Sequence, residues 1–360
     1  MSLSVLGGGI SCCMSSPANF SKEIVKLKEK VVSASLPPEL KERVEETMAR
    51  ISRMRRLGEY STEYEKTISY IDLITSLPWA KRSKDVLDLK RAKEILDSNH
   101  YGLEEVKERI LEYLAVLKLK APAKVRAPIL CFVGLVGTGK TTLAYSVAEA
   151  LGRKFARIPF GGLGDPLDLR GQSRLRPEAE PGLIIKALKR TATKNPVILL
   201  DEIDRVADEG RSSIMGVLVE LLDPEQNMAF QDHFVDYPFD LSEVLFIVTC
   251  NNTTNISVAV MDRLEPIQMP SYTDEEKITI GKDYVLPRTM KEIGLDREQI
   301  KINPDVWPKI VRPLGYDAGI RTLERTINGI CRRVAKMIVE GKGHQFHITT
   351  ENMKEFLPSW

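Results

Sequence analysis

The feature that most constrains the fold is the segment GLVGTGKT at residues 134–141, which lies between an apolar run and a helical pattern. It fits the P-loop pattern, in which backbone N–H groups cradle phosphates, a lysine reaches the β- and γ-phosphates, and a hydroxyl holds Mg²⁺. Glycines let the backbone approach the ligand, and the following helix directs its N-terminal dipole at the negative charge. The predicted phosphate site comprises Gly134, Leu135, Val136, Gly137, Thr138, Gly139, Lys140, Thr141 and Thr142.

A second apolar run, VILLDE at residues 197–202, ends in two acids. It predicts a buried strand that delivers Asp201 and Glu202 to its carboxyl end, where ligands bind in open α/β sheets. We expect Asp201 to hold Mg²⁺ together with Thr141. Glu202 is then the carboxylate that polarises the attacking water. Solvated acids at a strand end are the alternative, which the accompanying P-loop makes less attractive.

The apolar runs at 129–134, 197–202 and 244–250 alternate with helical patterns, which indicates an α/β fold with a parallel sheet covered by helices. Residues 85–120 read as helices interrupted at His100-Tyr101-Gly102, and beyond 270 the pattern is helical apart from a short strand at FHITT. The predicted domains are a disordered leader (1–20), a helical module (21–84), an α/β nucleotide-binding domain (85–270) and a helical domain (271–360).

Composition narrows the function classes. With 43% hydrophobic residues but no apolar run of about 20, we expect no membrane span. A net charge of +2 argues against a nucleic-acid or membrane partner. Five scattered cysteines do not form a disulfide framework, which favours the cytoplasm, although the Ser-rich start leaves an organelle matrix as the alternative. His233, His344 and His347 lack partners at metal-ligand spacing, so no zinc site is expected.

Several segments resemble, in order and spacing, the ATPase part of the Lon protease family over residues 36–356. They are SLPW (76–79), DSNHYGLEEVKERILEYLAV (97–116), the P-loop, the run VILLDE (197–202), ELLDPEQN (220–227), DRLE (262–265) and AGIRTLER (318–325). The resemblance implies the AAA+ class, with a helical N-terminal piece, an α/β nucleotide domain and a helical lid. It further implies ATP and Mg²⁺ as cofactors, and a homo-oligomer, a hexameric ring, that acts on polypeptides.

The resemblance also assigns roles to residues outside the P-loop. Asn251 resembles the sensor that hydrogen-bonds the lytic water or the γ-phosphate. Arg263 resembles the arginine finger given to the neighbouring subunit's ATP, and Arg321 resembles the second sensor. His100 and Tyr101 lie where the family approaches the adenine, with a helix-breaking turn as the alternative. From spacing alone, capping or pairing would be the better explanation for Asn251 and both arginines; the resemblance reverses that preference.

The chain departs from the family at two places. It stops at LPSW, soon after the lid, so we expect no peptidase site here and a separate peptidase as a conceivable partner. In the pore-facing loops, the family's GHRRTYIGAMPG is GQSRLRPEAEPG (171–182), with Arg176 and Pro177 replacing an aromatic and its neighbour, and DEGRSS (208–213) carries Gly210 for an aromatic. These changes leave two hypotheses open: an engine that threads polypeptides, or a nucleotide-controlled scaffold. A DNA-handling motor is the weaker third.

Overall fold

The computed structural model describes residues 17–56, 62–120, 128–312 and 318–358. The chain divides into two compact units, residues 1–81 and 82–360. The sequence predicts this division at residue 84. Most of the predicted leader lies outside the described residues, but its last four residues belong to the first helix, which begins at Pro17.

The first unit is helical, as predicted, with helices α1 (Pro17–Ser33), α2 (Pro38–Arg56) and α3 (Thr62–Ser76). Helix α2 begins at a proline, whose fixed φ suits the first helical position. The apolar residues Leu40, Val44 and Met48 recur every four residues along one face of α2, and all three are buried. Ile51, Met54 and Leu57 continue the series at three-residue intervals but lie outside the described side chains. Apolar burial along one helix face therefore organises this unit.

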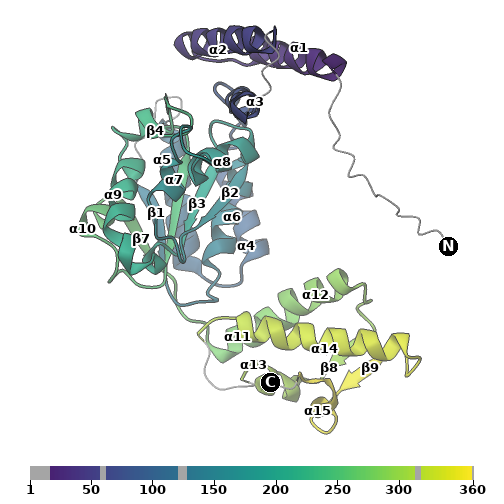
Figure 1. Cartoon of the computed structure of the whole chain (residues 1–360). Helices are drawn as coiled ribbons and strands as arrows, with labels where there is room; N and C mark the ends of the chain where they lie inside the picture. Colours follow the sequence, from purple (N-terminus) through teal and green to yellow (C-terminus); the bar gives the residue numbers. More distant parts are fainter. Residues whose placement is uncertain (1–16, 57–61, 121–127, 313–317, 359–360) are drawn as a thin grey trace, which may run out of the picture. The chain divides into compact units, whose positions relative to one another are not determined.

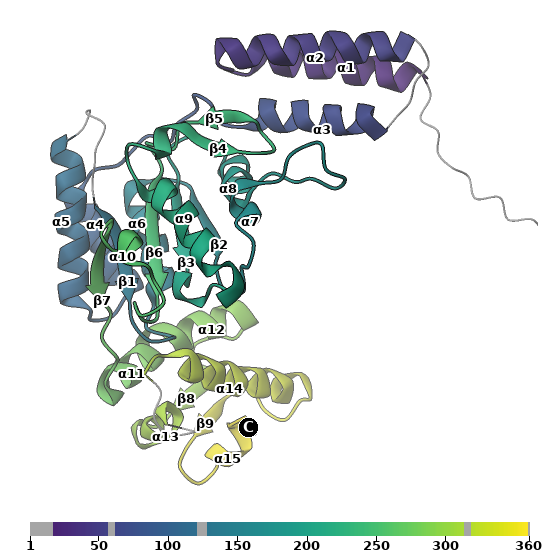
Figure 2. The same cartoon turned by 60° about the vertical axis from the view of Figure 1, so that its left-hand side comes forward.

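The second unit begins with the α/β part, whose five-stranded parallel sheet has the order β2-β3-β6-β1-β7. The strands are β1 (Ile129–Val133), β2 (Phe155–Pro159), β3 (Val197–Asp201), β6 (Leu245–Cys250) and β7 (Leu264–Gln268). The three predicted strands are the central ones. Helices α4 (Leu89–Asn99), α5 (Glu104–Lys120) and α6 (Lys140–Leu151) lie on one side of the sheet, and α8 (Leu183–Thr191) and α9 (Arg211–Leu222) on the other (Figures 1 and 2).

Residues beyond 270 are mainly helical. Helix α11 (Asp274–Ile280) continues through a π-helical turn (Gly281–Val285) into α12 (Leu286–Ile293), followed by α13 (Trp307–Val311) and α14 (Arg321–Val339). The predicted strand at FHITT is confirmed as β9 (Phe346–Ile348), which pairs with β8 (Ile300–Ile302). The remaining short elements are α7 (Leu167–Arg170), η1 (Ile203–Arg205), η2 (Asp208–Gly210), η3 (Asn227–Ala229), β4 (Phe230–Asp232), β5 (Tyr237–Phe239), α10 (Val258–Met261), η5 (Pro304–Val306) and α15 (Met353–Phe356).

Within the described ranges, no helix is both long enough and apolar enough to cross a membrane. The same residues contain no group of three or more His, Cys, Asp or Glu side chains arranged to hold a metal ion. Cys131, Cys250 and Cys331 are buried free thiols in β1, β6 and α14.

Candidate functional site

The loop between β1 and α6 has the geometry that its glycines predict. Gly137 and Gly139 have φ angles of 85° and 92°, in the left-handed region that favours glycine. A Cβ on Gly134 would lie 2.7 Å from the Cβ of Met269, so a larger residue does not fit there. The Thr138 hydroxyl donates to the Leu135 carbonyl at 2.9 Å. These contacts hold a tight loop directly before the helix N-terminus.

Lys140 is the first residue of α6, and its ammonium lies beneath this loop. Its Nζ donates to the carbonyls of Gly134 at 2.5 Å and Leu135 at 3.0 Å, and to Oδ1 of Asn251 at 3.2 Å. Burial lowers the pKa of Lys140, while nearby acidic groups, among them Glu202 and Asp201, oppose that shift. The cation is therefore fixed between the loop and the end of β6.

The two predicted acids lie at the same edge of the sheet. Oγ1 of Thr141 is 3.4 Å from Oδ1 of Asp201, as expected for two residues that share a cation. The buried Thr249 joins the acids, because its hydroxyl donates to Asp201 and accepts from the backbone N–H of Glu202 at 2.9 Å. Arg157 donates from Nε to the other oxygen of Asp201, Oδ2, at 2.6 Å.

Glu202 follows β3 with a φ of 59°, an unusual value for a residue with a side chain. Its side chain is 23% exposed, and its carboxylate lies 3.4 Å from the guanidinium of Arg205. Glu202 is thus a partly exposed acid near Lys140 and near the oxygen pair of Thr141 and Asp201. Such a carboxylate is suited to accept a proton from water.

The C-terminal helical part closes on the P-loop through the AGIR segment. The Ile320 N–H donates to the Gly137 carbonyl at 3.1 Å. A Cβ on Gly319 would lie 2.5 Å from the carbonyl oxygen of Val136 and the carbonyl carbon of Gly137, so glycine is required for this approach. The Tyr272 hydroxyl donates to the Thr138 carbonyl at 3.3 Å. Arg321, which begins α14, therefore lies next to the loop.

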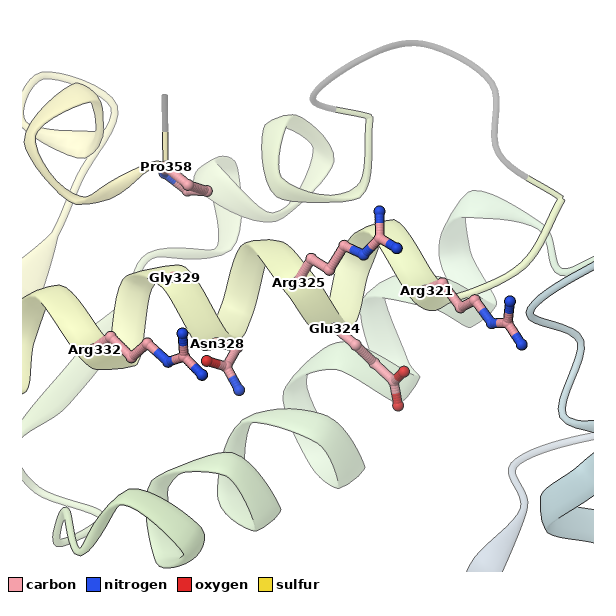
Figure 3. A pocket seen from close by; sticks show the side chains of 7 residues that line it. All are labelled: Arg321, Glu324, Arg325, Asn328, Gly329, Arg332 and Pro358. Atoms are coloured by element: carbon pink, nitrogen blue, oxygen red, sulfur yellow. The ribbon is translucent and has the colours of Figure 1, made fainter. Parts of the chain in front are cut away.

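Arg321 also lines a cavity of about 640 Å³ along α14 (Figure 3). The other lining residues are Glu324, Arg325, Asn328, Gly329, Arg332 and Pro358. Glu324 is paired with Arg288 at 2.7 Å, so the lining is predominantly cationic.

Comparison with known proteins identifies this arrangement. The family model for the ATPase family associated with various cellular activities (AAA) matches residues 130–272, and that for the Lon protease AAA+ ATPase lid domain matches 291–346. The Lon protease of Lawsonia intracellularis is 45% identical over 336 residues, which cover 93% of this chain. The chain carries a Lon-type AAA+ module.

Two further relatives give the same result. The Lon protease of Dictyoglomus thermophilum is 49% identical over 89% of this chain, and Lon protease 2 of Thermus thermophilus is 44% identical over 93%. This chain covers 40% of the Lawsonia protein, 40% of the Dictyoglomus protein and 43% of the Thermus protein. The Lon-type module here thus spans about two fifths of the length of these relatives.

The HYG segment of this Lon-type module is built into the fold. His100 is 6% exposed, and its Nε2 lies 3.0 Å from the Ser146 hydroxyl on α6. Burial lowers the pKa of His100 to about 4, so its ring is neutral near pH 7. The Tyr101 ring packs edge-on against Tyr284, with 6.2 Å between centroids. His100 therefore anchors the turn to α6, and contact with adenine stays a prediction for both residues.

Arg263 and the P-loop lie at opposite ends of the strands of the sheet. Arg263 directly precedes β7, where Leu264 pairs with Ile129 at the start of β1, while Gly134 follows the end of β1. The intervening strand spans about 16 Å, more than an arginine side chain can reach. The guanidinium pairs instead with Asp223 at 2.8 Å and with the Ala259 carbonyl at 2.6 Å. Arg263 thus belongs to a different face from its own chain's nucleotide site.

The two altered loops differ from each other in exposure. At 171–182 the two arms of the loop are joined by a bond from the Gln172 N–H to the Glu180 carbonyl at 3.0 Å, and Arg176 at the tip is exposed. The preceding Leu175 is an apolar side chain that is 94% exposed. The sequence analysis did not single it out, because it considered only the position of the family's aromatic residue. Gly210, in contrast, is buried, and a Cβ there would lie 1.9 Å from the Gly164 carbonyl oxygen. No side chain fits at that second position.

Sequence reasoning missed three residues of the site. Thr249, Arg157 and Asp204 contact the predicted residues Asp201, Glu202 or Asn251, but none belongs to a motif that spacing reveals. Thr249 had one available signal: it is a hydroxyl inside an otherwise apolar strand, VLFIVTC, at the end that carries Asn251.

Proposed function

We propose that this Lon-type module binds ATP with Mg²⁺ and hydrolyses it. The observation that carries the proposal is the meeting of Lys140, Thr141, Asp201, Glu202 and Asn251 at the carboxyl edge of one parallel sheet. In phosphoryl transfer the protein mainly positions groups and stabilises charge, and these residues supply both. The loop N–H groups and Lys140 would hold the phosphates.

The residues suit a magnesium ion. Mg²⁺ prefers oxygen ligands and usually keeps several waters, so a hydroxyl and one carboxylate oxygen are a sufficient protein contribution. Oγ1 of Thr141 and Oδ1 of Asp201 would hold it, while Arg157 engages the second Asp201 oxygen. The ion would supply charge neutralisation at the phosphates. Glu202, as an ionised carboxylate, would orient the attacking water and accept its proton.

The test is Glu202→Gln, which removes the base but keeps the side-chain shape. We expect kcat to fall by about 100-fold or more while ATP binding is retained. Steady-state Mg²⁺-ATPase assays and a fluorescent-nucleotide titration measure the two quantities. Glu94→Gln, at an exposed position of α4, is the matched control. Turnover at the parent rate in Glu202→Gln would show that another group is the base.

We further propose that the module works as a homo-oligomeric ring of the hexameric kind. The position of Arg263 supports this, because it faces away from its own nucleotide site and would have to act on a neighbour's. The pair with Asp223 would hold the guanidinium in place at the subunit surface.

Polypeptides are the proposed substrate of the ring. A threading loop needs a non-directional apolar contact with chains of any sequence, and Leu175 at the tip of 171–182 offers one. The competing function is a nucleotide-controlled scaffold. Arg176 is a hydrated cation, Pro177 is a stiff residue and the buried Gly210 has no side chain. All three features weaken the contact of these loops with a polypeptide and so favour the scaffold.

Variants at the loop tip separate these functions. If the loop grips, Leu175→Ser should abolish most of the stimulation of ATPase activity by an unfolded protein, and Arg176→Tyr with Pro177→Ile should increase it. Val339→Ser, which removes an equally exposed apolar group from the end of α14, is the control. The readouts are ATPase rate and capture of the unfolded substrate by a trap. A parent that ignores unfolded protein would favour the scaffold.

A further inference from the structure

The amide of Asn251 lies between a group that only donates hydrogen bonds and a group that only accepts them. Its Oδ1 accepts from Lys140 Nζ at 3.2 Å, and its Nδ2 donates to Oδ2 of Asp204 at 3.4 Å. An ammonium has no acceptor and a carboxylate has no donor. A flipped amide would set NH₂ against the ammonium and oxygen against the carboxylate. The two neighbours therefore allow only one orientation.

Asp204 is a buried acidic residue whose side chain is only partly hydrogen-bonded. It is 5% exposed and lies in η1, two residues after Glu202. Its Oδ1 is buried and has no hydrogen-bond partner among the described residues. A buried carboxylate oxygen without a partner destabilises the fold. The contact with Asn251, strengthened by the nearby Lys140 charge, is the use that the described structure shows for this side chain.

We propose that Asp204 is a positioning residue that fixes Asn251 with its oxygen toward the γ-phosphate site. This rests on the proposed ATP hydrolysis. Asn251 then acts there as an acceptor. Since phosphate oxygens also only accept, Oδ1 of Asn251 cannot hydrogen-bond the γ-phosphate; it bonds Lys140 and one O–H of the attacking water. As the water oxygen bonds to phosphorus and the bond to the ADP oxygen breaks, the other water proton passes to Glu202.

A polarity swap tests this assignment. Asn251→Asp alone places two carboxylates together, and kcat should fall by about 100-fold. Asp204→Asn alone removes the enforced orientation, and kcat should fall by about tenfold with ATP affinity unchanged. In the double variant the amide introduced at position 204 donates to the carboxylate introduced at position 251, which still accepts from Lys140. We expect the double variant to regain about tenfold in kcat over Asn251→Asp.

The measurements are kcat, nucleotide Kd and the melting temperature of all four proteins, with Asp305→Asn, an exposed acid, as control. Recovery in the double variant supports the acceptor role. If Asn251 must donate to phosphate, the double variant will be as slow as Asn251→Asp, which overturns the inference. If kcat falls only in proportion to the melting temperature, Asp204 has a purely structural role, and this result also overturns the inference. A parent without ATPase activity would reject the proposed function itself.

Discussion

His100 shows how burial of one residue couples protonation to stability. Its folded-state pKa is about 4, because the ring is buried against α6. The unfolded value is about 6.5, so the unfolded chain binds the proton first. The stability that the neutral ring contributes is fully present above about pH 6.5 and is lost as the pH falls toward 4. Between pH 7 and pH 5 the loss is about 2 kcal/mol.

We therefore predict that His100→Gln makes unfolding less sensitive to acid. Urea unfolding at pH 7 and pH 5 should show a free-energy difference smaller by about 2 kcal/mol in the variant than in the parent. His344→Gln, at an exposed position, should leave the parent's pH dependence intact. Equal acid sensitivity in parent and His100→Gln would mean that the buried ring does not titrate as its burial requires.

Among elements, the AGIR turn before α14 is the most sterically constrained contact with the P-loop. Gly319→Ala would place a Cβ 2.5 Å from the Gly137 backbone, so either the loop or the helical part must move. We predict a loss of ATP affinity of at least about tenfold. Nucleotide titration measures it, with Gly216→Ala as the matched control.

A Cβ at Gly216, inside α9, meets nothing within 4 Å. Alanine there should stabilise the helix by about 1 kcal/mol and leave nucleotide binding unchanged. If Gly319→Ala bound ATP as tightly as the parent, the approach of this turn to the loop would not matter for binding.

The same scale shows what sequence could and could not predict. The central strands β1, β3 and β6 are continuous apolar runs, because both of their faces are covered, and periodicity finds them. The edge strands β2 and β7 mix exposed and buried residues and each contains a proline, so their apolar patterns are weak. The motif residues of the site were predictable because each motif is a short continuous segment of the sequence. Thr249 and Asp204 were not, because their roles arise from contacts across strands.

For the whole molecule, the position of Arg263 predicts activity in trans. Hydrolysis per subunit should rise with protein concentration as rings form. Arg263→Ala and Glu202→Gln should each be nearly inactive alone, whereas a mixture should regain activity at interfaces that combine an intact Glu202 with a neighbour's Arg263. ATPase assays across mixing ratios, with sedimentation to establish assembly, provide the measurement. A constant rate per subunit down to monomer concentrations would contradict the prediction.

The strand order also dictates when, during synthesis, the P-loop can take shape. Strand β1 is made first among the five strands of the sheet, yet its sheet neighbours are β6 and β7, the last two of the five to be made. Until residue 250 leaves the ribosome, β1 has neither neighbour complete, and Gly134 lacks its bond to the Cys250 carbonyl. Closing parallel pairs over such sequence separation is slow. A nascent chain that ends before β6 therefore exposes an unpaired apolar strand and needs protection by a chaperone, and nucleotide cannot stabilise it.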